Sequence, residues 1–329
     1  MDIYFQNGYG KLYEEIEGGT AEIYNYKSSL GEIKHQYIRR EIPFDVSGGS
    51  RCYDLITPYG YGGPIVLSGN EDGKKDLCIA FEKEFSEYCK ENNIVCEFVR
   101  FHPVINNAKD FKEIYNPIFM RHTLGTNLKD YYDPIKNEFS KSCRQSVRQA
   151  LNKGVTYRVT HNPDNIDSFP EIYYSTMKRD NASEFYYFKQ SYFDEILRNF
   201  KENILYIEAL YQDKIISAGL YLICEGIIHI HLAGTLSEYL FSSSSYLLLY
   251  AAAIWGKENG CNLIHHGGGI TNSLDDSLYL YKKKFAQNTE FDFYVGKKIW
   301  DYEKYERFCM HKNVSPDIDF FPAYRSHVR

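Results

Sequence analysis

The chain has 329 residues, of which 43% are hydrophobic and 25% charged, values typical of a globular protein with one large or two ordinary domains. Its formal net charge of −6 argues against a protein that coats nucleic acid over its whole surface, but leaves room for a local basic patch. The N-terminus has no signal-peptide pattern, and the most apolar stretch, residues 246–255, is about half as long as a bilayer-spanning helix. We therefore expect a cytoplasmic protein whose eight cysteines are reduced.

The first half of the chain alternates between strand and helix patterns. A hairpin is predicted over residues 21–42 and a strand over 51–57. Residues 58–64, PYGYGGP, form a glycine-rich loop without the lysine and hydroxyl that a phosphate-binding P-loop needs. A helix over 74–93, with apolar residues at helical spacing, and a strand over 94–101 complete this half.

A basic segment joins the two halves. Residues 136–154 are predicted to form one helix with an apolar stripe and a basic stripe. Between residues 136 and 158 the only acid is Glu138, against six Lys or Arg. Two interpretations stay open: a solvated helix face, or a patch that binds a phosphate-bearing ligand through Arg144 and Arg148.

The second half repeats the order of elements of the first. It is predicted to contain strands over 204–210, 215–224, 226–233 and 262–269, and a helix over 244–259. The prediction is therefore an α+β fold with two similar units, each a mixed, mostly antiparallel sheet flanked by helices. We assign residues 1–150 to the first unit, 151–299 to the second, and 300–329 to a C-terminal segment that packs back on the first.

Four serines, Ser242 to Ser245, stand where the second half passes from a loop into its long helix. A helix N-terminus offers unpaired N–H groups and the positive end of the helix dipole, which suit a phosphate or a developing oxyanion. An ordinary serine N-cap is the alternative interpretation.

The order of these segments resembles the GNAT acyltransferase fold, and most of the chain resembles the Fem-like branch, whose members pair two GNAT-like units. The resemblance rests on five stretches: PYGYGGP at 58–64, RFHP at 100–103 with Asn107, the basic helix followed by YYSTMKRDNASEFYYF at 173–188, GIIHIHLAGT at 226–235, and HHGGGITNSLDDSLYLYKKKF at 265–285. The serine run departs from the glycine-rich signature with which GNAT enzymes bind CoA.

The resemblance implies an N-acyltransferase that acts by direct attack. An acyl or aminoacyl group would move from acyl-CoA or aminoacyl-tRNA to an amine of a nucleotide- or lipid-linked sugar or peptide, a precursor of peptidoglycan or capsule polysaccharide. Neither a metal nor a covalent nucleophile is expected, and contact with a membrane would be peripheral. The alternative is a catalytically inactive GNAT-scaffold module that binds an envelope glycan or a tRNA.

The candidate catalytic residues are Lys282, His231 and Asp275. By resemblance, Tyr281-Lys282 matches an aromatic-lysine pair whose lysine stabilises the transition state; a solvated lysine cluster is the alternative. His231 is a candidate base because imidazole titrates near neutrality. His229, His231, His265 and His266 with Asp275 can be drawn as a metal site, but hydrogen-bonded core histidines explain them equally well.

The candidate binding residues fall into two sets. The glycine-rich loop, with its flat tyrosine rings, suits stacking on a sugar or nucleobase, or forms a purely structural turn. The predicted substrate-binding residues are Tyr59, Tyr61, Gly63, Arg100, His102, Arg179 and Tyr186. The predicted acyl-donor-binding residues are Gly234, Thr235, Ser242, Ser243, Ser244, Ser245, Arg144 and Arg148.

Overall fold

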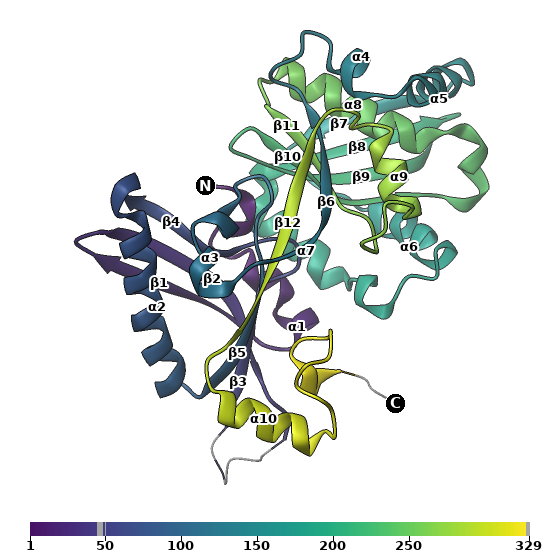
Figure 1. Cartoon of the computed structure of the whole chain (residues 1–329). Helices are drawn as coiled ribbons and strands as arrows, with labels where there is room; N and C mark the ends of the chain where they lie inside the picture. Colours follow the sequence, from purple (N-terminus) through teal and green to yellow (C-terminus); the bar gives the residue numbers. More distant parts are fainter. Residues whose placement is uncertain (45–48, 50, 327–329) are drawn as a thin grey trace. The chain divides into compact units, whose positions relative to one another are not determined.

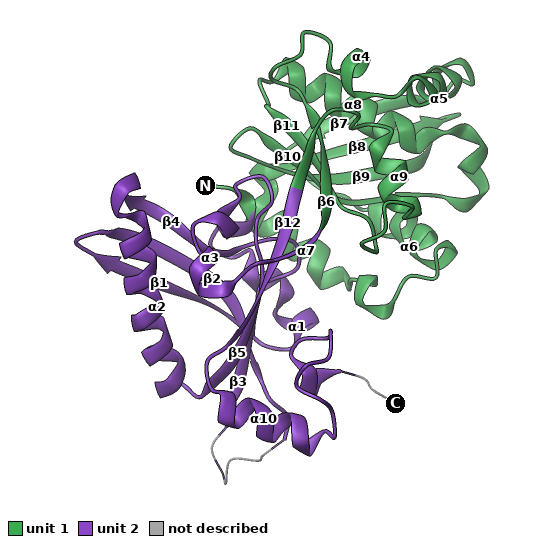
Figure 2. Ribbon diagram, viewed as in Figure 1, with its two compact units in different colours: residues 1–3, 121–291 green, residues 4–120, 292–329 purple. Residues whose placement is uncertain are grey.

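The computed structural model of the protein describes residues 1–44, 49 and 51–326 (Figure 1). The chain forms two compact units (Figure 2): unit 1 is Met1–Ile3 with Arg121–Phe291, and unit 2 is Tyr4–Met120 with Asp292–Arg329. The expected α+β class is confirmed, since each unit is a mixed sheet flanked by helices.

The boundaries of the two compact units differ from those of the expected ranges 1–150, 151–299 and 300–329. Residues 121–150 lie in unit 1, because the basic segment packs on the long helix of the second half. The C-terminal segment lies in unit 2 with the first half, and its residues 327–329 are outside the described residues. Within the described ranges, every helix is too short or too polar to cross a lipid bilayer.

Unit 2 is built on a sheet with the strand order β1-β2-β3-β5-β12, and β4 pairs with β2. Among the strand pairs of its described residues, β3 and β5 run parallel and the others antiparallel. Its elements are α1 (Glu14–Glu17), β1 (Thr20–Ser28), β2 (Gly31–Glu41), β3 (Tyr53–Ile56), β4 (Gly63–Gly69), α2 (Lys74–Glu91), β5 (Ile94–Arg100), α3 (Lys112–Tyr115), β12 (Glu290–Ile299) and α10 (Tyr302–His311).

The predicted hairpin, strands and helix of the first half are all present, but strand β4 was not predicted. Its residues follow the glycine-rich loop directly, and the run Ile65-Val66-Leu67 is too short to stand out as a strand in the sequence. Gly63 begins the strand with φ +80, a conformation that favours glycine, and an added Cβ would lie 2.6 Å from Val99.

The glycine-rich loop closes the gap between the parallel strands β3 and β5. After the last paired residues, Thr57 N–H donates to the Phe98 carbonyl (3.0 Å) and Gly62 N–H to the Arg100 carbonyl (2.8 Å). Asn107 donates to the carbonyls of Gly62 and Pro64, both at 2.8 Å. The loop therefore continues the sheet with its own backbone.

The C-terminal segment is held to unit 2 by a buried carboxylate. Asp54 accepts hydrogen bonds from Arg40 Nε (2.8 Å), Tyr324 OH (3.0 Å) and Arg325 Nε (2.5 Å). Helix α10 adds Tyr305 to a hydrophobic cluster with Val95 and Cys96 near the start of β5. This segment thus shares the core of the first half.

Unit 1 is built on a sheet with the strand order β6-β11-β10-β9-β8-β7, in which only β10 and β11 run parallel. Its elements are β6 (Ile118–Asn127), α4 (Pro134–Glu138), α5 (Lys141–Asn152), β7 (Thr156–His161), α6 (Phe169–Arg179), α7 (Gln190–Phe200), β8 (Ile204–Tyr211), β9 (Lys214–Cys224), β10 (Ile227–Thr235), α8 (Ser244–Glu258), β11 (Leu263–Gly267) and α9 (Ser277–Lys283).

Helices cover both faces of the unit 1 sheet (Figure 1). Leu205 and Ile207 of β8 belong to the core cluster that includes α5 and α8. Tyr206, which lies between them and points to the opposite face, contacts Phe169 of α6. The site described below therefore sits on a sheet that is buried on both sides.

The single helix predicted over 136–154 is wrong, because the structure divides it into α4 and α5. Phe139 is extended (φ −83°, ψ 129°), and the Ser140 hydroxyl accepts a hydrogen bond from Cys143 N–H (3.1 Å), which starts a new helix. A serine N-cap in the middle of an amphipathic pattern was the signal for this break.

Gly234 allows α6 to approach the end of β10. A Cβ at this position would lie 2.6 Å from the Ile172 carbonyl oxygen and 2.8 Å from the Tyr173 Cα. Both atoms belong to the backbone of α6, so they cannot move aside as a flexible side chain would.

We expect Gly234→Ala to lower the free energy of unfolding by about 1–3 kcal/mol, since overpacking against backbone forces the helix away from the strand. Gly73→Ala is the matched control, because no heavy atom lies within 4 Å of its added Cβ. Urea unfolding followed by circular dichroism measures both variants, and equal midpoints would contradict the close packing of α6 on β10.

Candidate active site

Lys282 is a partly buried ammonium on α9 whose single hydrogen bond goes to backbone. Among the described residues its Nζ donates only to the Gly268 carbonyl (2.7 Å) in the glycine triplet after β11. Burial lowers the pKa of Lys282 to about 8, the Asp276 carboxylate opposes this shift, and the Arg121 guanidinium adds to it. At neutral pH the group is still mostly charged, with N–H donors to spare for a ligand oxygen.

Asp276 fixes the loop that carries Lys282. Its carboxylate accepts hydrogen bonds from the N–H groups of Leu278 and Tyr279, and so caps α9, and from the N–H groups of Ile270 and Thr271. Burial alone would raise the pKa of Asp276, but these hydrogen bonds hold it well below its usual range. Asp275, the predicted catalytic residue, is exposed, and only its backbone N–H contacts the loop.

Two of the four serines, Ser242 and Ser244, secure the start of α8 with their hydroxyls. Ser242 Oγ donates to the Tyr239 carbonyl (2.6 Å) and accepts from Ser244 N–H (3.2 Å). Ser244 Oγ bonds Ser217 Oγ (2.5 Å) in the core. Ser243 takes the left-handed conformation with φ +58, the kind of turn at which glycine is usual.

Side chains of α8 and α9 meet beside Lys282. The pKa of Tyr281 is raised by burial, and a hydrogen bond with Ser245 opposes that rise. Lys284 Nζ donates to the Tyr246 hydroxyl (3.2 Å). The structure thus brings the predicted catalytic lysine and the predicted donor-binding serines into one neighbourhood of unit 1.

The parallel strands β10 and β11 separate next to this neighbourhood. Their ladder has three pairs, from Ile227–Leu263 to His229–His265, and then stops within the described part of the chain. Strand β10 nevertheless continues to Thr235 and β11 to Gly267. Beyond the last pair the two strands no longer pair with each other in the described structure, and the N–H and C=O of Thr235 bond to α6 instead.

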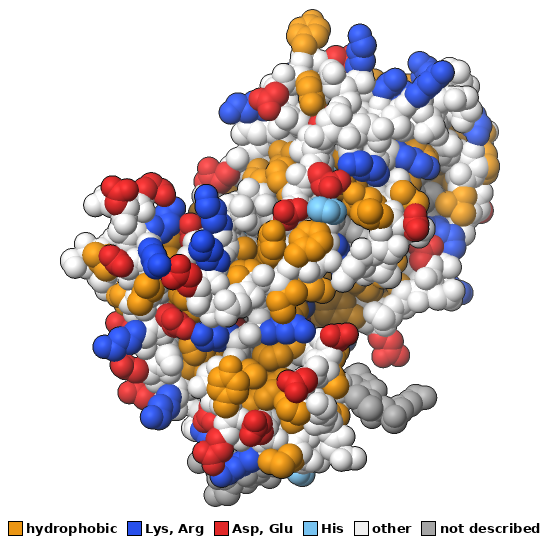
Figure 3. Space-filling model, in the orientation of Figure 1, with side chains coloured by type: hydrophobic (Ala, Val, Ile, Leu, Met, Phe, Trp, Pro, Cys, Tyr) orange, Lys and Arg blue, Asp and Glu red, His pale blue; other side chains and the backbone are white. Residues whose placement is uncertain are grey.

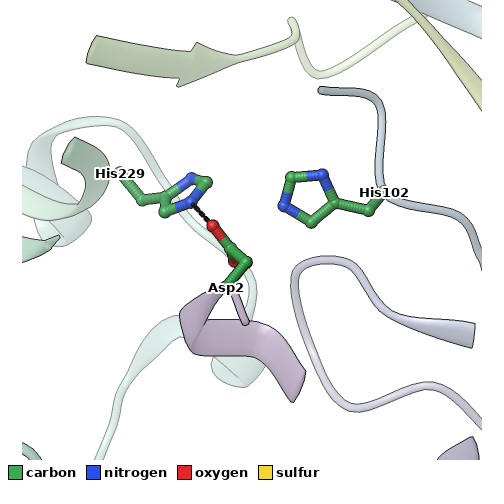
Figure 4. A group of neighbouring side chains, drawn as sticks. All are labelled: Asp2, His102 and His229. Atoms are coloured by element: carbon green, nitrogen blue, oxygen red, sulfur yellow. Dashed lines mark hydrogen bonds and ion pairs between the residues drawn. The ribbon is translucent and has the colours of Figure 1, made fainter. Parts of the chain in front are cut away.

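A buried chain of polar side chains crosses the sheet at the last pair. His229 Nε2 bonds Asp2 Oδ2 (2.8 Å), as Figure 4 shows, and its Nδ1 lies 3.4 Å from His265 Nδ1. His265 Nε2 in turn bonds Thr123 Oγ1 (3.0 Å). The two histidines thus connect three elements of unit 1.

His231 lies at a β-bulge, where the pairing of β10 with β9 skips it. Tyr192 OH lies 2.5 Å from its Nε2. Burial, and secondarily the proximity of His229, lower the pKa of His231 to about 3. Such an imidazole is neutral at physiological pH but is a weak base, which removes the reason for proposing it as the general base.

Several predicted ligand-binding groups of unit 1 bind each other. Thr176 Oγ1 accepts from Thr235 N–H (2.8 Å), and the Thr235 carbonyl accepts from Arg179 Nη1 (3.0 Å). The Tyr186 carbonyl accepts from Tyr173 OH (2.9 Å). These contacts assign Gly234, Thr235 and Arg179 to the junction of α6 with β10.

Only part of the basic segment is exposed and available to a ligand. Arg144 donates to the carbonyls of Lys136 and Phe139 and so joins α4 to α5, whereas Arg148 is exposed. Figure 3 shows Lys and Arg side chains gathered over α4 and α5. The exposed members Lys141 and Arg148 remain as a basic surface on unit 1.

The predicted substrate-binding residues of unit 2 gather around the glycine-rich loop. The Tyr61 ring lies 5.4 Å from that of Tyr4 and 5.6 Å from that of His102. The Tyr59 carbonyl accepts from Tyr9 OH (2.9 Å). Arg100 Nη1 donates to the Thr57 carbonyl (2.6 Å) at the start of the loop. Tyr59 and Tyr61 stay half-buried within this aromatic cluster.

Comparisons with known proteins agree with this architecture. Residues 109–211 match the model of the FemAB family. The crystal structure of FemX is 13% identical and has a TM-score of 0.68, over 92% of this chain and 93% of FemX. The chain has a Fem-like fold. No curated protein matches the sequence.

Two further structures share the Fem-like fold at low identity. The C-terminal domain (DUF2156) of a putative lysylphosphatidylglycerol synthetase from Agrobacterium fabrum is 14% identical, with a TM-score of 0.58 over 93% of this chain and 91% of that domain. L-PGS from Bacillus licheniformis is 14% identical, with a TM-score of 0.55 over 89% of this chain and 92% of that one.

Sequence reasoning missed two residues that shape the candidate site. Asp276, rather than Asp275, holds the loop, and an aspartate directly before Ser277 and an apolar run was a usable N-cap signal. Thr126 of β6, which hydrogen-bonds His266 (2.8 Å), gave no signal, because its partner is distant in the chain.

The lowered pKa of Lys282 has a measurable consequence for stability. Between pH 8 and its ordinary value of 10.5 the unfolded chain holds a proton that the folded chain has released, so stability rises with pH in that window. Across this pH window, the free energy of unfolding of the parent should rise by up to about 3 kcal/mol more than that of Lys282→Met. Lys283→Met, which keeps Lys282, should follow the parent; parallel curves for all three would contradict the shift.

Proposed function

We propose that this chain is an N-acyltransferase that moves an acyl or aminoacyl group to an amine of a cell-envelope precursor. The attacking nitrogen forms a bond to the carbonyl carbon, and the bond from that carbon to the donor oxygen or sulfur breaks. The proton lost by the amine goes to the leaving oxygen or sulfur. Lys282 offsets the negative charge that develops on the acyl oxygen.

The observation that carries this proposal is the environment of Lys282. A cation with spare donors lies against the start of α8, through Tyr281 and Ser245, beside the separated ends of β10 and β11. A solvated lysine cluster would have neither the burial nor the fixed partner. The Fem-like fold supports the same class of reaction.

The donor is proposed to bind unit 1, because the matching gap in unit 2 is closed by Gly62 and Thr57. Two donors are considered, aminoacyl-tRNA and acyl-CoA. The Fem-like fold and the names of the lysylphosphatidylglycerol synthetases favour the aminoacyl form, and the exposed residues Lys141 and Arg148 suit a phosphate backbone. The acceptor is proposed to be a nucleotide- or lipid-linked sugar or peptide, and the tyrosine rings of the glycine-rich loop in unit 2 suit stacking on a sugar or nucleobase.

The rival proposal is a Fem-like module that binds without chemistry. The argument for this proposal is that serines replace the glycine-rich signature with which GNAT enzymes bind CoA. Ser243 weakens that argument, because its φ of +58 keeps the glycine-like turn. Retention of the turn favours an intact donor site.

We expect Lys282→Met to lower single-turnover acyl transfer by about 100-fold or more, while donor binding changes little, because the ammonium acts on charge that exists only in the transition state. Lys283→Met is the matched control, since Lys283 is one residue away and pairs with Glu290 (2.9 Å). Radiolabelled aminoacyl-tRNA and acetyl-CoA are tested as donors. A Lys282→Met variant that binds and transfers like the parent would exclude this mechanism.

The two donors differ in their response to charge. A tRNA donor predicts that transfer falls by about tenfold or more between about 50 and 200 mM salt, and that Arg148→Glu weakens it further. Lys112→Glu, an exposed lysine of unit 2, is the control. A CoA donor instead predicts a small salt effect and a higher Tm in the presence of free CoA. Transfer from neither donor would count against the proposed function.

A further inference from the structure

His266 is a buried histidine near Lys282 to which the proposed reaction gives no role. Its side chain is 2% exposed, and it lies at a bulge in β11, where the pairing with β6 passes from His265 to Gly267. Its ring lies along that of Phe285, with centroids 6.2 Å apart. The bulge therefore directs an imidazole out of the regular ladder and toward α9.

Thr126 fixes which ring nitrogen of His266 carries the proton. Thr126 Oγ1 donates its only hydrogen to the Phe285 carbonyl (2.8 Å), which can act only as an acceptor. The contact of 2.8 Å between Thr126 Oγ1 and His266 Nε2 therefore requires Nε2–H as the donor. In a neutral ring, Nδ1 is then left with a bare lone pair.

That lone pair is unsatisfied in the described structure. Nδ1 is buried and has no hydrogen-bond partner there, which costs about 1–3 kcal/mol for a polar group removed from water. Burial first, and the charge of Lys282 second, lower the pKa of His266 to about 3. The ring consequently stays neutral and remains an acceptor across the physiological range.

We propose that His266 Nδ1 accepts a hydrogen bond from the attacking amine and so orients the lone pair of that amine toward the acyl carbon. This inference rests on the proposed acyl transfer. As the carbon–nitrogen bond forms, the nitrogen gains positive charge, and its N–H···Nδ1 bond strengthens. Lys282 stabilises the negative charge that develops on the acyl oxygen. Each of the two developing charges is therefore stabilised by a fixed side chain. His266 does not keep the proton, which leaves with the donor group.

Paired substitutions separate this role from a merely structural one. Gln at this position can replace the Nε2 contact with Thr126 but has no acceptor at Nδ1, whereas Asn places an amide oxygen near Nδ1 and loses the contact with Thr126. A structural histidine predicts that His266→Gln is the better replacement. The proposed role predicts that His266→Asn is.

Single-turnover transfer from the donor that the parent uses is measured for both variants, with thermal unfolding as a check on folding. We expect His266→Gln to lower the rate by about tenfold or more with an unchanged KM for the donor, and His266→Asn to stay within about threefold of the parent. A His266→Gln variant as fast as the parent, or a His266→Asn variant slower than His266→Gln, would overturn the inference.

A second measurement does not depend on turnover. ¹⁵N NMR of histidine-labelled parent protein, with His266 assigned through His266→Gln, should show a protonated Nε2 and a bare Nδ1 that does not titrate near neutrality. At a pH at which both amines are neutral, millimolar glycine dimethylamide should move the Nδ1 resonance, and N,N-dimethylglycine dimethylamide, which has no N–H at all, should not. A protonated Nδ1, or equal responses to the two probes, overturns the inference even if transfer is observed. If transfer is absent but the probes behave as expected, only the proposed function fails.

Discussion

The ladder between the parallel strands β10 and β11 ends at His229 and His265, and the acyl transfer proposed for unit 1 depends on that early ending. Backbone N–H and C=O groups in a buried sheet need partners, so strands that part must be completed by another segment or by a ligand. Unit 2 has the same parallel pair in β3 and β5, but its own Gly62 and Thr57 complete the sheet. The parallel pair is therefore closed by the chain in unit 2 and left open in unit 1, which is the physical reason for proposing that the donor binds unit 1.

Much of the fold could be predicted from the sequence because its signals are local. The hairpin β1–β2, the meander β8–β10 and the helices α2 and α8 each show their periodicity and turns within a short window. The break at Ser140 had a local signal, an N-cap serine, which the amphipathic pattern around it hid, whereas the apolar run of β4 was too short to stand out. The boundaries of the units lacked any local signal, since β6 and β12 carry the chain from one unit to the other and back.

The candidate site was less predictable, because its members act through contacts between distant residues. Lys282 and the serine run could be named from motifs, but the choice of Asp276 over Asp275 depends on which side chain turns inward. Thr176 and Arg179, far away in the sequence, hydrogen-bond the backbone of Thr235, and Gly234 packs against the backbone of α6, contacts that no local pattern indicates. The hydrogen bond between Thr126 and His266 is likewise a contact between residues that are distant in the sequence. Sequence patterns identified residue types suited to chemistry, whereas packing determined which of these side chains keep an unused hydrogen-bond donor or acceptor.

Unsatisfied polar groups distinguish the neighbourhood of Lys282 from the rest of unit 1. Asp276 is fully engaged, and each hydroxyl of the serine run except that of Ser243 has a named partner. By contrast, Lys282 uses one of its three donors, and His266 Nδ1 uses none of its acceptor capacity within the described residues. A fold that depended only on stability would pair these groups or replace them with apolar side chains, because a buried polar group without a partner lowers stability. An arrangement in which a cation with free donors and a neutral acceptor persist side by side is explained if a ligand brings the missing partners, a carbonyl oxygen for one and an amine N–H for the other.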